Sequence, residues 1–337
     1  MRDTLERYRG RICSGEIEPL VHWDGQTAGL IFDPADEDAP LSILGFGACR
    51  LTSERYRLKT GEREFAFVPL VGDFQIRVDQ QVFRGSRPGP FATRPGSSNA
   101  YAVYAPAGSH VEVTGNGEVV YYTAPARTSK PPVMITPGQR PDVLCGAGVW
   151  LREVVALLSP EEVTTTLVVG ETYSPPGLWS GSPLHVHDLD DPEHGQSDHE
   201  EVYFHVARHT GGEWGPYGVQ LLFDSQGLNR AYVIGDHDAF AVPGAAHPVI
   251  AGPTCDMLYV WGLAGTGSSL KMRDVPEFAF LKRIGGVLDQ LARTHPRPAV
   301  ACSLVDRLVR EAGFTPEQAH VLRMHLRQQG FEIVPRQ

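Results

Sequence analysis

The chain has 337 residues, of which 42% are hydrophobic and 21% are charged, and it contains 36 glycines and 27 prolines. This length suggests about two domains with real cores, and the glycine and proline content argues against long disorder and against a mostly helical bundle. The formal net charge of −10 repels a phosphate backbone over most of the surface and excludes nucleic acid as a main partner.

Cysteine usage and the N-terminus indicate the compartment. The five cysteines are far apart and odd in number, and no two form a CxxC pair: Cys13, Cys49, Cys145, Cys255 and Cys302. Such spacing is typical of separate, reduced thiols. The first ten residues carry no apolar stretch of signal-peptide type, and no run of about 18 apolar residues follows. We therefore expect a cytoplasmic protein with no membrane association.

Short β-branched and aromatic runs, broken by turn residues, extend from about Leu41 to Gly265. This pattern is typical of a β-sandwich or β-barrel. Three residues in similar contexts recur at one offset of 137 residues, so that Glu64, Pro106 and His110 correspond to Glu201, Pro243 and His247. The recurrence predicts an internal duplication that gives two barrels.

The last part of the chain has helical periodicity. Ser303 is expected to begin one helix that ends at Gly313, and Thr315–Gln318 forms a capping box with Pro316 at the first helical position. From residue 273 to residue 337 the charge is +3. A helix-turn-helix is one interpretation of this appendage, and we prefer a packing or oligomerisation module.

The histidines are clustered. Eight of the 13 lie between His185 and His247. His185 and His187 point to the same face of a β-strand, because side chains alternate with a period of two. Together with Glu201 and His247 they predict a site for one divalent ion. We expect Zn or Mn, with Fe, Ni or Co as further candidates, because imidazole and carboxylate ligands suit these ions and leave positions open for catalysis.

Further candidates share the face of Glu201 on its strand. Tyr203 and His205 would line the same cavity, either as acid/base or substrate-orienting groups or as packing residues. Gln220 would form hydrogen bonds with the substrate. Glu200 should point away from the cavity, because it alternates with Glu201.

Four segments together resemble a known family. They are Gly170–Asp188 with its HxH motif, Glu200–His205, Val242–Val249 and Asp256–Gly265. They are similar to the KduI/IolB-type bicupin isomerase family, which includes 5-deoxy-glucuronate isomerase and 5-keto-4-deoxyuronate isomerase. The resemblance covers roughly Pro40 to Gly265, is strong in the second half and faint in the first, and leaves the helical appendage unmatched.

The resemblance implies a mainly β bicupin fold, with two jelly-roll β-barrels from an internal duplication and a C-terminal helical appendage. We assign residues 1–145 to a degenerate N-terminal barrel without metal, 146–267 to a metal-binding barrel and 268–337 to the appendage. No HxH motif precedes Glu64. The family's metal ligands fall on the four residues of the second half: His185, His187, Glu201 and His247.

Two positions depart from the family pattern. The resemblance implies a lysine between the paired histidines and an arginine after the glutamine of a later strand, where this chain has Val186 and Leu221. A buried substrate carboxylate needs a charge-assisted partner. Arg152 and Arg230 are our candidates for that substrate-binding role.

The function implied is a metal-dependent sugar isomerase, an intramolecular oxidoreductase of the aldose–ketose type. It would interconvert the aldehyde and ketone forms of a small uronate-like or polyhydroxylated substrate through a cis-enediolate, and we expect a homo-oligomer. One alternative is a cupin dioxygenase that uses the same three histidines and glutamate. Another is a non-catalytic sugar-binding or regulatory bicupin.

Overall fold

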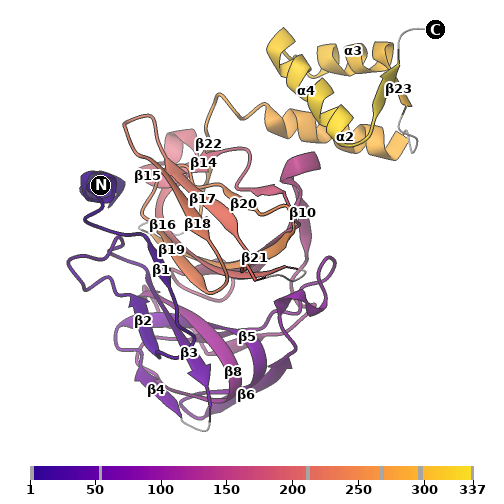
Figure 1. Cartoon of the computed structure of the whole chain (residues 1–337). Helices are drawn as coiled ribbons and strands as arrows, with labels where there is room; N and C mark the ends of the chain where they lie inside the picture. Colours follow the sequence, from indigo (N-terminus) through magenta and orange to yellow (C-terminus); the bar gives the residue numbers. More distant parts are fainter. Residues whose placement is uncertain are drawn as a thin grey trace.

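The computed structural model describes residues 4–52, 55–209, 213–265, 267, 269–294 and 299–334. Two β-barrels stack on each other, and a helical appendage lies beyond the second barrel, on the side away from the first (Figure 1). The prediction of a mainly β chain with a C-terminal helical appendage is confirmed. Among the described residues, no helix is long and apolar enough to cross a membrane.

The first barrel is one antiparallel sheet in the order β2-β3-β8-β5-β7-β9, with β4 paired to β8 and β6 paired to β5. Its elements are β2 (Gly29–Phe32), β3 (Gly45–Leu51), β4 (Tyr56–Lys59), β5 (Arg63–Val78), β6 (Gln81–Arg87), η1 (Pro90–Ala92), β7 (Ala102–Ala105), β8 (His110–Pro125) and β9 (Val133–Ile135). Phe65 and Phe67 of β5 point into its core together with Val113 and Tyr121. The alternation along β5 sends Ala66 to the opposite face.

The second barrel consists of two sheets. One has the order β1-β19-β16-β21-β12-β11-β10, with β15 paired to β16, and the other has the order β13-β20-β17-β18. The elements that precede β16 are β1 (Leu20–His22), β10 (Val143–Cys145), η2 (Gly148–Trp150), β11 (Arg152–Leu158), β12 (Val168–Ser174), β13 (Trp179–Ser180), β14 (His185–Val186), β15 (Asp188–Asp191) and η3 (Pro192–His194). They are followed by β16 (Gln196–His209), β17 (Gly218–Phe223), β18 (Asn229–Ile234), β19 (Asp238–Val242), β20 (Val249–Ala251), β21 (Cys255–Gly265) and β22 (Arg273–Asp274). The side chains of Tyr203, Leu222, Phe240 and Met257 fill the core between the two sheets.

The two barrels share a strand order. The path β3-β8-β5-β7 in the first corresponds to β12-β21-β16-β19 in the second. Two sets of antiparallel pairings fix the register: Phe65 pairs with Ala105 and Thr123, and Glu201 pairs with Val242 and Leu263. This common topology is what an internal duplication produces.

The strand pairings shift the expected correspondence between Glu64 and Glu201 by one residue. Phe65 occupies the place of Glu201, so the counterpart of Glu64 is Glu200. The match of His110 to His247 is also wrong, because His110 begins β8 with 72% of its side chain exposed, whereas His247 is buried. Because Glu200 and Glu201 are adjacent, Glu64 can be aligned with either of them, and the sequence alone does not reveal the one-residue shift.

Glu64 and Glu200 perform equivalent tasks between the barrels. Glu200 accepts hydrogen bonds from the backbone N–H groups of residues 42–44 and from the Ser42 hydroxyl, at 2.7–3.0 Å. Glu64 accepts them from the N–H groups of residues 165–167 and from the Thr165 hydroxyl, at 2.7–2.8 Å. Each barrel therefore binds the turn that precedes the matching strand of the other barrel.

Apolar side chains fill the space between the facing sheets. Val202 and Phe204 of β16 pack there with Ala66 and Val68 of β5. Each large apolar side chain that is fully buried contributes about 1.5–3 kcal/mol to folding. Gly262 permits the close approach of the sheets, because a Cβ at this position would lie 2.2 Å from the Tyr122 ring.

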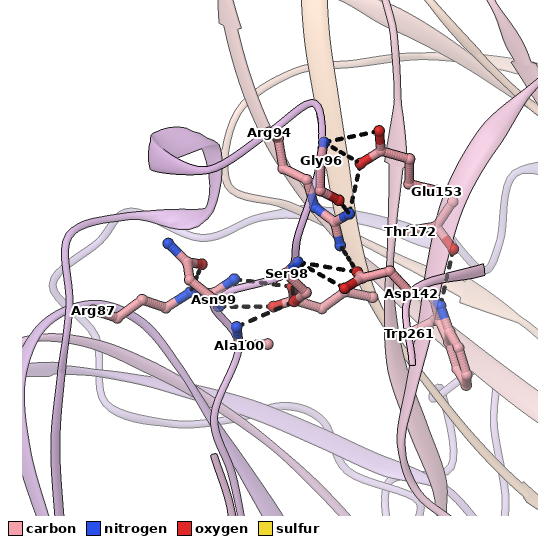
Figure 2. Close-up of polar contacts among 11 residues, drawn as sticks. Arg87, Arg94, Gly96, Ser98, Asn99, Ala100, Asp142, Glu153, Thr172 and Trp261 are labelled. Carbon is pink, nitrogen blue, oxygen red and sulfur yellow. Dashed lines mark hydrogen bonds and ion pairs between the residues drawn. The ribbon is translucent and has the colours of Figure 1, made fainter. Parts of the chain in front are cut away.

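Buried ion pairs add polar contacts between the barrels. Arg87, at the end of β6, donates two hydrogen bonds to the Glu171 carboxylate of β12, at 2.7 and 2.9 Å, and both side chains are fully buried. Figure 2 shows Arg94 between the carboxylates of Glu153 and Asp142, at 2.6 and 3.1 Å. These contacts join the segment after β6 to the second barrel's sheet.

The N-terminal segment also crosses between the barrels. Helix α1 (Thr4–Ser14) places Leu5, Tyr8 and Ile12 in the core of the second barrel. β1 then pairs with β19 of that barrel. The division into residues 1–145, 146–267 and 268–337 stays a prediction, to which the structure adds these contacts of residues 4–22 with the second barrel.

The helical appendage has a core of its own. It consists of α2 (Leu281–Thr294), β23 (Ala299–Ala301), α3 (Cys302–Glu311), α4 (Pro316–Gln328) and β24 (Glu332–Val334), and β23 and β24 are parallel. The capping box between Thr315 and Gln318 is confirmed. The expected helix from Ser303 is present as α3, which begins one residue earlier, at Cys302, and ends before Gly313.

We predict that Glu200→Gln and Glu64→Gln each destabilise the fold by about 2–4 kcal/mol. An amide group presents an NH₂ to backbone N–H donors that need an acceptor, and a buried donor without an acceptor is costly. Thermal unfolding measures the effect, with Glu277→Gln at an exposed position as the control. Midpoints equal to that of the control would contradict the structural role of this contact.

Candidate metal centre

A cavity of about 210 Å³ opens at one end of the second barrel. Its polar lining includes Arg152, Thr172, His185, Glu201, Tyr203 and Tyr259. Most of the other lining side chains are apolar and include Trp261, Leu263, Leu270 and Met272. An apolar cavity with a few convergent polar groups is the usual form of a small-molecule site.

Three histidines predicted from the sequence come together, and one of them, His185, lines this cavity. One nitrogen from each of His185, His187 and His247 lies within 4.8 Å of the others. His185 belongs to β14, His187 directly precedes β15, and His247 lies in the loop between β19 and β20. Their ring centroids are 4.9–6.2 Å apart. The period-two prediction for the HxH pair agrees with this convergence.

Glu201 of β16 lies beside two of these histidines. Its Oε2 atom lies 3.2 Å from Nε2 of His187 and 3.2 Å from Nε2 of His247. Two ligand atoms that are each about 2.1 Å from one ion, at angles between a right angle and a tetrahedral angle, are about 3.0–3.4 Å apart. Nε2 of His247 is buried and has no hydrogen-bond partner among the described residues. The arrangement fits a divalent cation.

Backbone carbonyls orient the three imidazole rings. The Nδ1 atoms of His185, His187 and His247 lie 3.3, 3.0 and 2.8 Å from the carbonyl oxygens of Pro183, His199 and Ala245. A carbonyl can only accept, so each Nδ1 carries the proton and donates it. Each Nε2 then keeps its lone pair, which is the tautomer that a metal ligand requires.

The protonation states also suit a cation. Burial, together with the neighbouring His247 and His187, lowers the pKa of His185 to about 3. Burial raises the pKa of Glu201, but its close contacts with the His187 and His247 rings outweigh this effect and hold its pKa at about 2. At neutral pH the site therefore contains a neutral His185 and an ionised carboxylate.

Tyr203 and His205, which share a face of β16, differ in their access to the cavity. Tyr203 lines it, and its ring centroid is 5.8 Å from that of His247. Burial raises the pKa of Tyr203 well above its usual value, so its hydroxyl stays protonated. His205 lies deeper, behind Tyr203 and Tyr259, and burial lowers its pKa to about 3. It is not among the residues that line the cavity.

The three predicted substrate-binding residues lie in different places. Arg152 lines the cavity. Gln220 contacts the loop that carries His247. Its amide nitrogen donates to the carbonyl oxygen of His247 at 2.8 Å and so supports this loop. Arg230 lies elsewhere, since its guanidinium donates to the carbonyl oxygens of Ile12 and Cys13 at the end of α1. Helix α1 was not predicted, and it accounts for this position of Arg230.

The sequence analysis did not assign several residues that form the cavity wall. Tyr259, Trp261 and Leu263 share one face of β21, and the period-two pattern of that strand could have identified them. Leu270 and Met272 come from the segment that follows β21. Nothing local in the sequence shows that this segment crosses the mouth of the barrel.

Comparisons with known proteins identify relatives along most of the chain. The model of the KduI/IolB family matches residues 20–281. The 5-deoxy-glucuronate isomerase of Geobacillus kaustophilus is 30% identical over 255 residues, which are 74% of this chain and 89% of that protein. The same enzyme of Geobacillus thermodenitrificans is 28% identical, over 74% and 90% of the two chains.

Solved structures share the fold. An IolB-like protein from Salmonella typhimurium superposes with a TM-score of 0.71 at 24% identity and covers 79% of this chain and 99% of its own. Oxalate decarboxylase of Bacillus subtilis gives a TM-score of 0.54 at 10% identity, over 82% and 84% of the two chains. The bicupin prediction is confirmed, as is that of a sugar isomerase of the intramolecular oxidoreductase class. The chain belongs to the KduI/IolB family.

Proposed function

We propose that this isomerase is metal-dependent and interconverts the aldehyde and ketone forms of a small uronate-like substrate through a cis-enediolate. The observation that carries the proposal is the convergence of three histidine side chains, two of which also lie 3.2 Å from the Glu201 carboxylate at the cavity. The relatives named 5-deoxy-glucuronate isomerase support the choice of a sugar acid. The ligands would be His185, His187, Glu201 and His247.

A bound divalent ion would act as a Lewis acid that polarises the carbonyl oxygen and lowers the cost of negative charge on it. The chain's own groups then recognise the rest of the substrate. The Arg152 guanidinium lines the cavity and can bind a carboxylate through charge-assisted hydrogen bonds. The protonated Tyr203 hydroxyl can donate a hydrogen bond to an oxygen that gains charge. The apolar wall that includes Trp261 limits the access of water.

His205 takes a smaller part in this proposal than the sequence analysis gave it. Its ring is fully buried and lies outside the cavity lining, so we assign it no contact with substrate. Gln220 becomes a support for the loop that carries His247, through the hydrogen bond to its carbonyl oxygen. Tyr203 is the remaining candidate for acid/base work or substrate orientation.

We predict that His187→Ala and Glu201→Gln lower the content of bound divalent metal from about one ion per chain to less than about 0.2, with activity lost in parallel. Folding should survive, because the cores of both barrels are apolar and do not depend on the ion. Elemental analysis and circular dichroism measure the two effects. His194→Ala and Glu193→Gln, on η3, are matched controls. Unchanged metal content would contradict the ligand assignment.

A proton-transfer experiment tests the reaction. Metal-loaded protein and candidate keto or aldehyde uronates in deuterium oxide, without oxygen, should show isomerisation in NMR spectra with deuterium uptake at the carbon beside the carbonyl. An enediolate exchanges that proton with solvent, and a dioxygenase needs oxygen. Activity that requires oxygen would favour the dioxygenase. Prolonged binding without any change of the sugar would favour a binding protein.

We predict that Arg152→Ala raises KM for a uronate by about 10–100-fold and changes kcat less, because a carboxylate without its charge-assisted partner binds more weakly in both the ground state and the transition state. For a neutral sugar of the same carbon skeleton, the effect should be small. The matched control is Arg230→Ala, since the Arg230 side chain contacts α1 instead of the cavity. An equal loss with both substrates would contradict carboxylate recognition by Arg152.

The cellular setting is part of the proposal. The five cysteines are all free, including the buried Cys49 and Cys255, which suits a reducing compartment such as the cytoplasm. We further propose a small-molecule sugar acid as the partner and a homo-oligomer as the assembled form. Sedimentation of the purified protein measures its oligomeric state.

A further inference from the structure

His185 lies on a strand that pairs outside the barrel sheets. Its strand, β14, forms a separate two-stranded sheet with β22. His185 pairs with Asp274 and Val186 pairs with Arg273. Next to this ladder, the backbone N–H of Val275 donates to the carbonyl oxygen of Leu184 at 2.8 Å. The backbone around one candidate ligand is therefore fixed by a segment that follows the last barrel strand.

The other two histidines are held from within the barrel. The carbonyl oxygen of His187 accepts from the N–H of His199 on β16, at 2.7 Å. The loop that carries His247 is held by Gln220 of β17 and by a bridge between Phe223 and Ala246. His185 thus depends on a different part of the chain from its two neighbours.

We call the segment Leu270–Val275 the strap. Leu270 and Met272 form part of the cavity wall. Between them, the backbone N–H of Lys271 donates to the Ser197 hydroxyl at 2.8 Å, and its carbonyl oxygen accepts from the N–H of Ser197 at 3.0 Å. The strap is therefore hydrogen-bonded on one side to β16, which carries Glu201, and on the other side to β14.

The helical appendage anchors the far end of the strap. Lys282, in the first turn of α2, forms an ion pair with Asp274 at 2.6 Å. The core of the appendage includes Trp150 of η2, whose ring stacks edge-on against His325 of α4 with centroids 4.7 Å apart. Trp150 also connects with the cavity, because its carbonyl oxygen accepts from the Arg152 guanidinium at 3.3 Å.

We propose that the strap, anchored by the helical appendage, is a positioning element that holds His185 in the ligand set. Residues 282–337, which include most of the appendage, lie beyond the match to the family model. The proposal assigns to these residues a role in positioning a candidate metal ligand. A ligand held in place before the ion arrives loses less conformational freedom on binding. Loosening of the strap should therefore weaken metal binding while His187, His247 and Glu201 stay in place.

The test removes one hydrogen bond at Val275. Val275→Pro deletes the N–H that donates to Leu184, whereas Val275→Ala trims the same side chain and keeps that N–H. Titration with Co²⁺ alone, followed by its visible absorption, should give about tenfold weaker binding for Val275→Pro than for Val275→Ala, with an altered spectrum from the loss of one imidazole. Hydrogen exchange of residues 184–187 should be faster in the proline variant.

A second pair of variants tests the anchor. Trp150→Ala removes the ring that packs against α4, and Trp150→Phe keeps an aromatic ring there. Trp214→Ala, at an exposed tryptophan, is the control. We expect weaker Co²⁺ binding for Trp150→Ala, with rescue by phenylalanine and no change for Trp214→Ala. If Val275→Pro fails to fold, as judged by circular dichroism, this second pair decides the question.

The outcomes separate this proposal from the one on which it rests. The strap hypothesis uses the metal site of the proposed function. If the unsubstituted chain binds no Co²⁺, that metal site is refuted. If it binds Co²⁺ and the two Val275 variants have equal affinities, whether both normal or both weakened, the strap proposal alone is overturned. Retained affinity in Trp150→Ala would overturn the part assigned to the appendage.

Discussion

The alternation of side chains along β16 is the constraint on which the rest of the structure depends. Glu201 and Tyr203 point into the second barrel, and Glu200, Val202 and Phe204 point toward the first. One strand therefore carries both a candidate ligand and the contact between the barrels. A slip by one residue would exchange the two sets and place the candidate ligand in the apolar layer between the sheets. The hydrogen bonds that Glu200 accepts from residues 42–44 oppose such a slip, because they fix the strand from its other face.

The two barrels are alike in the contacts that join them and differ at the position of the candidate metal site. Glu64 and Glu200 make equivalent hydrogen bonds across the interface. On the inward face, Phe65 stands where the second barrel has Glu201, and its ring packs against Phe67 and Tyr121. An aromatic core at this place leaves no carboxylate for a cation. This difference agrees with the prediction that the first barrel serves as structural support, and the interface gives it that role.

The sequence contains enough to predict the fold class and the cluster of three histidines, because strand periodicity and residue order point to both. The HxH pair follows from the period of a strand, and Glu201 and His247 follow from their order in the chain. Three features depend on long-range packing and lie outside such rules. The role of Glu200 can be predicted only when the pairing register of β16 is known. The position of Arg230 depends on how α1 docks on the second barrel. The strand that pairs with His185 depends on the path of the chain after β21. Helix α1 itself could have been predicted from the spacing of Leu5, Tyr8 and Ile12.

The contact between the second barrel and the appendage explains why Leu221 stands where the family resemblance implies an arginine. Leu221 lies on the outer face of β17, in a groove of about 310 Å³ that is also lined by Trp150, Phe278 and Leu281. A guanidinium in this groove would lose water without gaining an acidic partner among the described residues that line it, at a cost of several kcal/mol. Leucine instead adds apolar surface to the contact between barrel and appendage. With position 221 turned to this groove, Arg152 is the one cationic side chain among the described residues that line the cavity, and its carbonyl partner in Trp150 belongs to the same contact. The proposed recognition of the substrate by Arg152 and the docking of the appendage are in this way physically linked.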